Sequence, residues 1–154
     1  MNEKKIHAAE RGQDEAVVTR LRVMLERLRA SFTEYLSLLE HEEVAIVEGD
    51  IEKLEHHIEV EKRIVAEILA LRRVIEPLET MYTALTDVDV PDIPALRGSL
   101  ERMNERVRER TARNRTLLRE RIAATRVELS ELRVPAGRWL NDASDAPSLF
   151  DVSG

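Results

Sequence analysis

The feature that most constrains the fold is an apolar repeat in the first third of the chain. Its members are Val18, Leu21, Leu25, Leu28, Phe32, Tyr35, Leu39 and Ile46, which follow one another in steps of three, four or seven residues. A mean spacing of about 3.5 residues places them on one narrow face of an α-helix that can pack against another helix over its whole length. The pattern predicts a long helix and a function that resides in a surface rather than in a pocket.

The composition indicates an all-α protein. Of 154 residues, 35% are charged and 3% are aromatic, with only five Gly and five Pro, which favours long helices over sheets. Long thin helices expose much surface for their mass, so their apolar seams must be covered within the chain or by a partner. No cysteine is present, which excludes disulfides and thiolate metal sites.

A Gly-Asp pair predicts where the chain reverses. The first helix is expected over about 14–48, with Asp14 as its N-cap and Gly49 as its stop, and Asp50 is expected to cap a second helix over 51–85. Two such helices form an antiparallel hairpin in which the numbers of neighbouring residues sum to about 100. Pro77 is expected to kink the second helix or to mark a restart. The second seam comprises Ile51, Leu54, Ile58, Val65, Ile68, Leu71, Ile75, Leu78, Tyr82 and Leu85.

A third helix is expected over 95–133, after a loop at 87–94 in which Asp92 is placed to cap it. Pro135 and Gly137 follow its end. The whole then forms one elongated three-helix bundle or coiled coil over residues 1–134, with a flexible C-terminal tail at 135–154. The third stripe comprises Leu96, Leu100, Met103, Val107, Thr111, Asn114, Leu118, Ile122, Thr125, Leu129 and Leu132.

The charges are unevenly distributed. Residues 1–95 carry 12 Lys and Arg against 21 Asp and Glu, whereas residues 96–133 carry 11 Arg against six Glu. Opposite charges favour packing of the third helix along the hairpin. A nucleic-acid face would use Arg102, Arg106, Arg113 and Arg119, but interspersed glutamates neutralise it and no aromatic side chain is available to stack a base. We therefore expect no nucleic-acid partner.

The sequence offers no recognisable catalytic or metal-binding motif. His41, His56 and His57 lie near the predicted turn, but none belongs to the Glu-x-x-His pattern of a di-iron bundle. The hairpin register is expected to bring Glu42 close to His57 as an ion pair. Glycine-rich phosphate loops, nucleophile elbows and zinc-binding helices are also missing. We expect a protein that is not an enzyme and that needs no cofactor or metal.

The start of the chain lacks the apolar stretch of a secretory signal. No segment approaches the roughly 20 consecutive apolar residues of a membrane span. We expect a cytoplasmic protein without membrane insertion.

Four segments carry a resemblance to a known family. Residues 38–54 join a leucine-rich helix to the Gly-Asp turn, and Glu61-Lys62-Arg63 follows one heptad later; residues 114–118 read Asn-Arg-Thr-Leu-Leu, and residues 149–154 read Leu-Phe-Asp-Val-Ser-Gly. In this order they resemble the FlgN-type flagellar export chaperones, with Phe150 where that family usually has Tyr and with an unusually Arg-rich third helix.

The resemblance implies a chaperone that binds the terminal helices of hook-filament junction proteins, keeps them unassembled and delivers them to the flagellar type III export gate. Client binding is expected in a groove along the third helix, where polar residues interrupt the apolar stripe. The candidate client-binding residues are Thr111, Asn114, Leu117, Leu118, Ile122, Thr125, Leu129 and Leu132. Phe150 and Asp151 are the candidates for docking of the tail.

Two alternatives stay open. The interrupted stripe suits either a reversible groove or core positions near a wet edge of the bundle. The first seam, with Leu21, Leu25, Leu28 and Phe32, also suits a structural coiled-coil or adaptor protein that self-associates and has no export client. A continuous helix through Gly49 would favour that second function.

Overall fold

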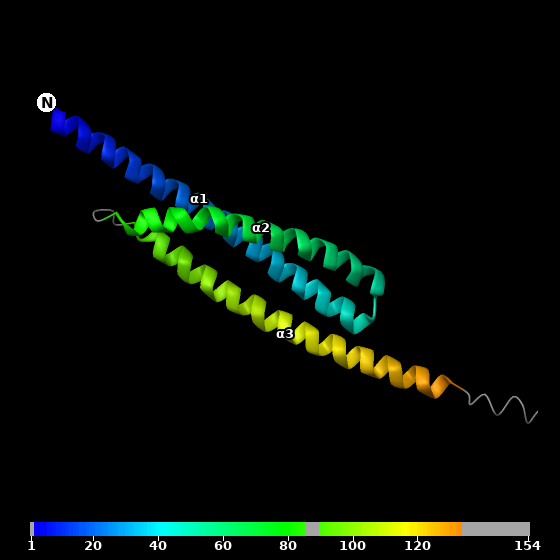
Figure 1. The fold of residues 1–154 in the computed structure, drawn as a ribbon. Coiled ribbons are helices and arrows are strands. Elements are labelled where there is room, and N and C mark those ends of the chain that lie inside the picture. The colour runs from blue at the N-terminus through cyan, green and yellow to red at the C-terminus, as the bar shows by residue number, and fades with distance from the viewer. Residues whose placement is uncertain (1, 86–89, 134–154) are drawn as a thin grey trace, which may run out of the picture. The chain divides into compact units, whose positions relative to one another are not determined.

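The protein consists of three long helices. The computed structural model describes residues 2–85 and 90–133, and within them α1 spans Asn2–Glu48, α2 spans Ile51–Thr83 and α3 spans Asp92–Leu132, with no strand (Figure 1). The expected all-α class is confirmed. The chain divides into two compact units, Met1–Leu118 and Arg119–Gly154. The bundle domain expected over residues 1–134 and the tail expected at 135–154 stay predictions, and α3 contributes residues to both units.

The first helix begins earlier than expected. We expected Asp14 to cap it, but α1 starts at Asn2 and continues through Gly12. A glycine within an exposed helix costs only about 1 kcal/mol relative to alanine, and its neighbours favour a helix. The side chains of His7 and Glu10 also lie 3.3 Å apart, one helical turn from each other. The prediction was wrong because it took Asp14 as the helix start from its residue type alone.

The turn between α1 and α2 has the predicted residues in the predicted roles. Gly49 has a left-handed backbone with φ of 71°, and the Asp50 amide donates to the Ala45 carbonyl at 3.0 Å, as in a Schellman motif. The Asp50 carboxylate then accepts from the Lys53 amide at 3.0 Å and so caps α2. This hydrogen bond lowers the pKa of Asp50, and the contact with Asp50 raises the pKa of Lys53.

The helices α1 and α2 pair in the expected antiparallel register. The Tyr35 hydroxyl donates to Glu61 Oε1 at 2.6 Å, and Arg63 Nη2 lies 2.9 Å from Glu34 Oε1. The numbers of these partners sum to slightly less than 100. α2 continues through Pro77 and ends at Thr83, so the proline does not mark a restart.

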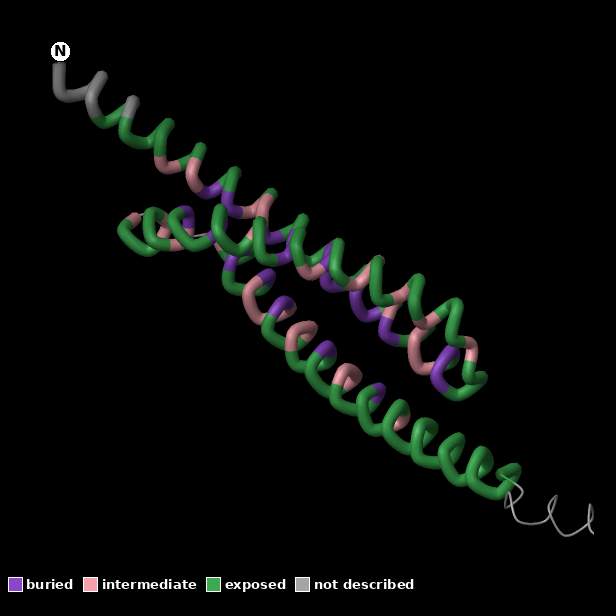
Figure 2. Tube along the Cα trace, turned by 45° about the vertical axis from the view of Figure 1, so that its right-hand side comes forward, coloured by how far each residue is buried: buried purple, intermediate pink, exposed green. Residues whose placement is uncertain are grey.

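All eight members of the α1 seam are buried, which confirms the opening prediction (Figure 2). The α2 seam differs at its start, because Ile51 and Ile58 are exposed whereas Ile64 is fully buried. His57 and Glu61 are half-buried, so polar side chains occupy the seam near the turn. Near the turn, the seam predicted for α2 is therefore displaced by about one residue from the side chains that are buried, because the prediction considered apolar residues only.

The first part of α3 packs on the hairpin and runs parallel to α1. Its buried side chains are Ile93, Leu96, Leu100, Val107 and Asn114. Arg22 lies 3.5 Å from Asp92, and Arg110 lies 2.9 Å from Glu40, so partners on the two helices are about 70 residues apart. Within Met1–Leu118 the basic helix therefore meets the acidic hairpin, as the charge distribution predicted.

The pair formed by Tyr35 and Glu61 predicts a change in stability at alkaline pH. Burial and the Glu61 carboxylate raise the pKa of Tyr35. A raised pKa in the folded state contributes stability that is complete below the unfolded value near 10 and is lost as the pH rises above it. Between pH 10 and 11, wild type should lose up to about 1 kcal/mol more than Tyr35→Phe in urea unfolding. Parallel pH profiles of the two proteins would contradict this.

From their backbone conformations, we expect replacement of Gly49 and Gly12 by alanine to have different effects on the free energy of unfolding. Gly49→Ala should lower the free energy of unfolding by about 1 to 2 kcal/mol, because alanine is strained at positive φ. Gly12→Ala should leave it unchanged or raise it by up to about 1 kcal/mol, because Gly12 lies in a helix with open space around an added Cβ. Thermal or urea unfolding measures both. A stabilising Gly49→Ala would indicate a continuous helix through the turn.

Candidate functional site on α3

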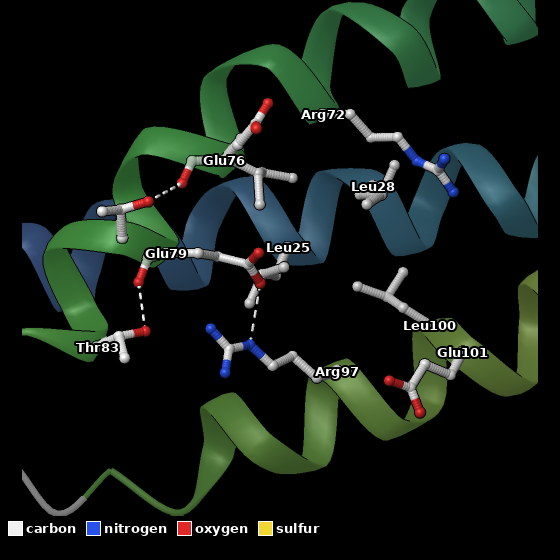
Figure 3. Close-up of a pocket in the computed structure, with 11 residues that line it drawn as sticks. Leu25, Leu28, Arg72, Glu76, Glu79, Thr83, Arg97, Leu100 and Glu101 are labelled. Atoms are coloured by element: carbon white, nitrogen blue, oxygen red, sulfur yellow. Dashed lines mark hydrogen bonds and ion pairs between the residues drawn. The ribbon is translucent and has the colours of Figure 1, made fainter.

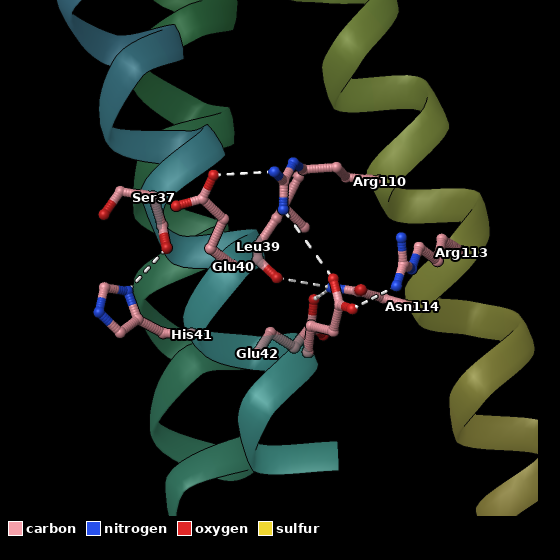
Figure 4. A network of polar contacts seen from close by, with 9 residues as sticks. Ser37, Leu39, Glu40, His41, Glu42, Arg110, Arg113 and Asn114 are labelled. Carbon is pink, nitrogen blue, oxygen red and sulfur yellow. Dashed lines mark hydrogen bonds and ion pairs between the residues drawn. The ribbon is translucent and has the colours of Figure 1, made fainter. Parts of the chain in front are cut away.

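Asn114 lies in the interface between α1 and α3, with only 3% of its surface exposed. Its Nδ2 donates to the Leu39 carbonyl at 2.9 Å and to Glu42 Oε2 at 2.8 Å (Figure 4). Asn114 Oδ1 is buried and has no hydrogen-bond partner among the described residues. Glu42 is thus engaged by α3, and the expected ion pair between Glu42 and His57 is absent from the described contacts.

Two arginines flank this asparagine and bind the acidic side of α1 (Figure 4). Arg110 lies 2.9 Å from Glu40, and Arg113 lies 2.8 Å from Glu43. These charged pairs are partly solvated, so each stabilises the interface only modestly. Together with Asn114 they align the two helices in one register.

Two of the expected groove residues therefore belong to the helix interface. Asn114 is bonded to α1, and Thr111 is half-buried, with a buried hydroxyl oxygen that has no partner among the described residues. Asn114 is polar because α1 presents a carbonyl and a carboxylate opposite it, whereas the Thr111 hydroxyl oxygen is enclosed without a described partner. The structure assigns Thr111 and Asn114 to packing rather than to an accessible surface.

The remaining expected residues become increasingly exposed along α3. Leu117 is half-buried, and Thr125 is exposed, with its hydroxyl donating to the Arg121 carbonyl at 3.0 Å. The large apolar side chains have exposed fractions of 38% for Leu118, 44% for Ile122, 59% for Leu129 and 77% for Leu132. Figure 2 shows the last turns of α3 as exposed throughout. An exposed apolar stripe is therefore present on this helix.

The sequence interpretation did not connect the arginines beside this stripe with it, and it named only Arg119 among them, as part of a possible nucleic-acid face. Arg119, Arg126 and Arg133 are exposed and lie seven residues apart, so they lie on one side of the helix, next to Leu118, Thr125 and Leu132. Their spacing was a usable signal, but counting net charge over the helix concealed it. The tail candidates Phe150 and Asp151 lie outside the described residues.

A separate hollow of about 670 Å³ lies within Met1–Leu118 between the three helices (Figure 3). Leu25, Leu28 and Leu100 contribute aliphatic surface, and Arg97 and Glu79 form an ion pair of 2.9 Å across it. The hydroxyls of its two threonines are used by backbone carbonyls of α2. This arrangement packs helices together and brings no nucleophile and base into contact.

The histidines do not assemble a metal site within the part of the chain that the structure describes. Over residues 2–85 and 90–133, no group of three or more His, Asp or Glu side chains is placed to hold a metal ion. His41 Nδ1 lies 2.7 Å from the Ser37 carbonyl one turn earlier, and the rings of His56 and His57 are 6.3 Å apart. Among the described helices, none has a stretch apolar and long enough to span a bilayer.

Comparison with known proteins identifies one relative of similar length. An "Uncharacterized protein" of Treponema pallidum (strain Nichols) is 29% identical over 139 residues, which cover 90% of this chain and 90% of that protein. No family profile and no solved structure matches the chain. The similarity extends along nearly the whole helical chain and carries no assignment of function.

Proposed function

We propose that this protein is a cytoplasmic export chaperone of the FlgN type. It binds amphipathic terminal helices of hook-filament junction proteins, prevents their premature assembly and delivers them to the type III export gate. The observation that supports this proposal best is the exposed apolar stripe of α3, with Leu118, Ile122, Leu129 and Leu132. The tail residues Phe150 and Asp151 are assigned to docking on the client or the gate by the resemblance alone.

The physical argument rests on what an exposed stripe can bind. Apolar side chains spaced by three and four residues form the surface on which an amphipathic helix packs with its own i, i+3, i+4 and i+7 positions. Burial of this surface contributes about 25 cal/mol per Å², less the cost of ordering the bound segment. A junction protein that polymerises through terminal helices exposes such a segment before assembly, and covering it keeps the protein monomeric.

The surface expected for a self-associating coiled coil is not exposed. Leu21, Leu25, Leu28 and Phe32 are buried within the chain by the other helices. The left-handed Gly49 ends α1, so no helix continues into a parallel dimer at this point. Self-association through the α3 stripe would compete with the client for the same residues.

The proposal predicts that charge in the stripe abolishes client capture without unfolding the protein. In Leu118→Asp with Ile122→Asp, binding of helical terminal segments of junction proteins should fall at least tenfold, because a buried carboxylate would oppose the apolar contact. Helicity should be retained because both side chains are exposed. Titration calorimetry and circular dichroism measure the two effects.

Val127→Asp is the matched control. Val127 is 56% exposed and lies on the side of α3 opposite Leu118 and Ile122, so this variant should bind as wild type does. Absence of binding by wild type would overturn the proposal. A parallel loss of helicity in the double variant would show that Leu118 and Ile122 support the fold.

A further inference from the structure

The exposed part of α3 has the sequence order of a coiled-coil seam with one uniformly basic edge. Leu118, Ile122, Thr125, Leu129 and Leu132 alternate by four and three residues, as the two seam positions of a heptad do. Arg119, Arg126 and Arg133 each follow one of these positions directly and repeat every seven residues. In a heptad they occupy one of the two positions that border the seam.

These three arginines are available for a partner. All three are exposed, and none forms an ion pair with a carboxylate of the residues that the structure describes. Arg97, Arg110 and Arg113, by contrast, are paired with glutamates of the hairpin. Arg97, Arg110 and Arg113 thus serve packing within Met1–Leu118, whereas over residues 119–133 no arginine is paired with a described carboxylate.

The opposite edge of the seam is mixed. Arg121 and Glu128 occupy the other bordering position in successive heptads, so their charges compensate. Because only one edge is uniformly basic, the surface distinguishes the two sides of a helix laid along it. Charges that border a seam determine partner choice and orientation more than total affinity.

A surface hollow brings the two features together. It has a volume of about 490 Å³ and is lined by Arg126, Leu129, Ser130, Leu132 and Arg133. Apolar side chains and guanidinium groups thus border the same space within Arg119–Gly154. A segment that fills it gains apolar contact and a charged partner together.

We propose that this face binds an amphipathic helix that carries a row of acidic side chains along one edge of its apolar stripe. Each glutamate or aspartate of that row would pair with an arginine of the 119, 126 and 133 series while the two stripes pack together. This inference rests on the proposed function and specifies the chemistry of its client.

A second copy of the chain fits this face less well than an acidic helix does. In an antiparallel pair the two arginine rows would face each other, whereas in a parallel pair Arg121 would face Arg126 and Glu128 would face Arg133 of the other copy, so repulsion and attraction would offset each other. Like charges across a helix pair oppose association. The charge pattern therefore favours an acidic partner over self-association.

The test uses two synthetic helical peptides with the same leucine stripe, one with glutamates and one with lysines along the same edge. Full-length protein should bind the glutamate peptide at least tenfold more tightly at low salt, and the difference should shrink in about 0.5 M salt as charges are screened. Equal affinities at low salt would overturn the inference. Fluorescence anisotropy with labelled peptides gives both constants.

The variant Arg119→Glu with Arg126→Glu should reverse the preference so that the lysine peptide binds more tightly. The matched control is Arg102→Glu with Arg106→Glu, which changes the net charge equally at exposed positions of α3 that lie away from this edge and should keep the preference for glutamate. An unchanged preference in the first variant, or a reversal in both, would overturn the inference.

The two proposals can fail separately. If junction-protein helices bind regardless of the charge along their edge, the export function stands and the acidic requirement falls. If the glutamate peptide binds but no junction-protein segment does, the acidic-helix surface stands and the client assignment falls.

Discussion

The rest of the structure depends on burial of the α1 seam. A single face of this helix packs against both α2 and α3, and Leu21, Leu25, Leu39 and Ile46 are at most 2% exposed. Full burial of one such side chain stabilises a fold by about 1.5 to 3 kcal/mol, so this seam outweighs the partly solvated ion pairs around it. Removing α1 would leave the other two helices without a common apolar surface.

Apolar packing alone would allow α3 to slide along α1. Polar contacts between the two helices fix their relative position. Asn114 is bonded to both a carbonyl and a carboxylate of α1, and Arg110 and Arg113 bind glutamates one turn apart. A slip of one turn would leave the asparagine amide and Leu39 carbonyl contact unmade in a dry interface, which is costly. The register of α3 is therefore set by few groups.

Periodicity and composition were sufficient to predict the all-α class and the eight residues of the α1 seam, because a helix that buries one face must repeat apolar residues along it, and the Gly-Asp pair predicted the turn. Ser31, Leu36 and Ala45, which α1 also buries, were not predicted. The α2 seam near the turn was less predictable, because His57 and Glu61 occupy seam positions that an apolar count skips. The α3 stripe was predicted as one surface. Which part of the stripe is packed and which is exposed depends on where the hairpin ends. The helical repeat of apolar residues gives no information about that point.

The parallel register between α1 and α3 has a consequence for how such a surface arises. Partners are about 70 residues apart and α1 ends at Glu48, so α1 has no residue left to pair with α3 beyond about Leu118. The length of the hairpin thus decides how many leucines of α3 find an intramolecular neighbour. Inserting matched heptads on both sides of Gly49 would lengthen the hairpin and bury more of the apolar side chains of α3, whereas deletions would leave more of them exposed.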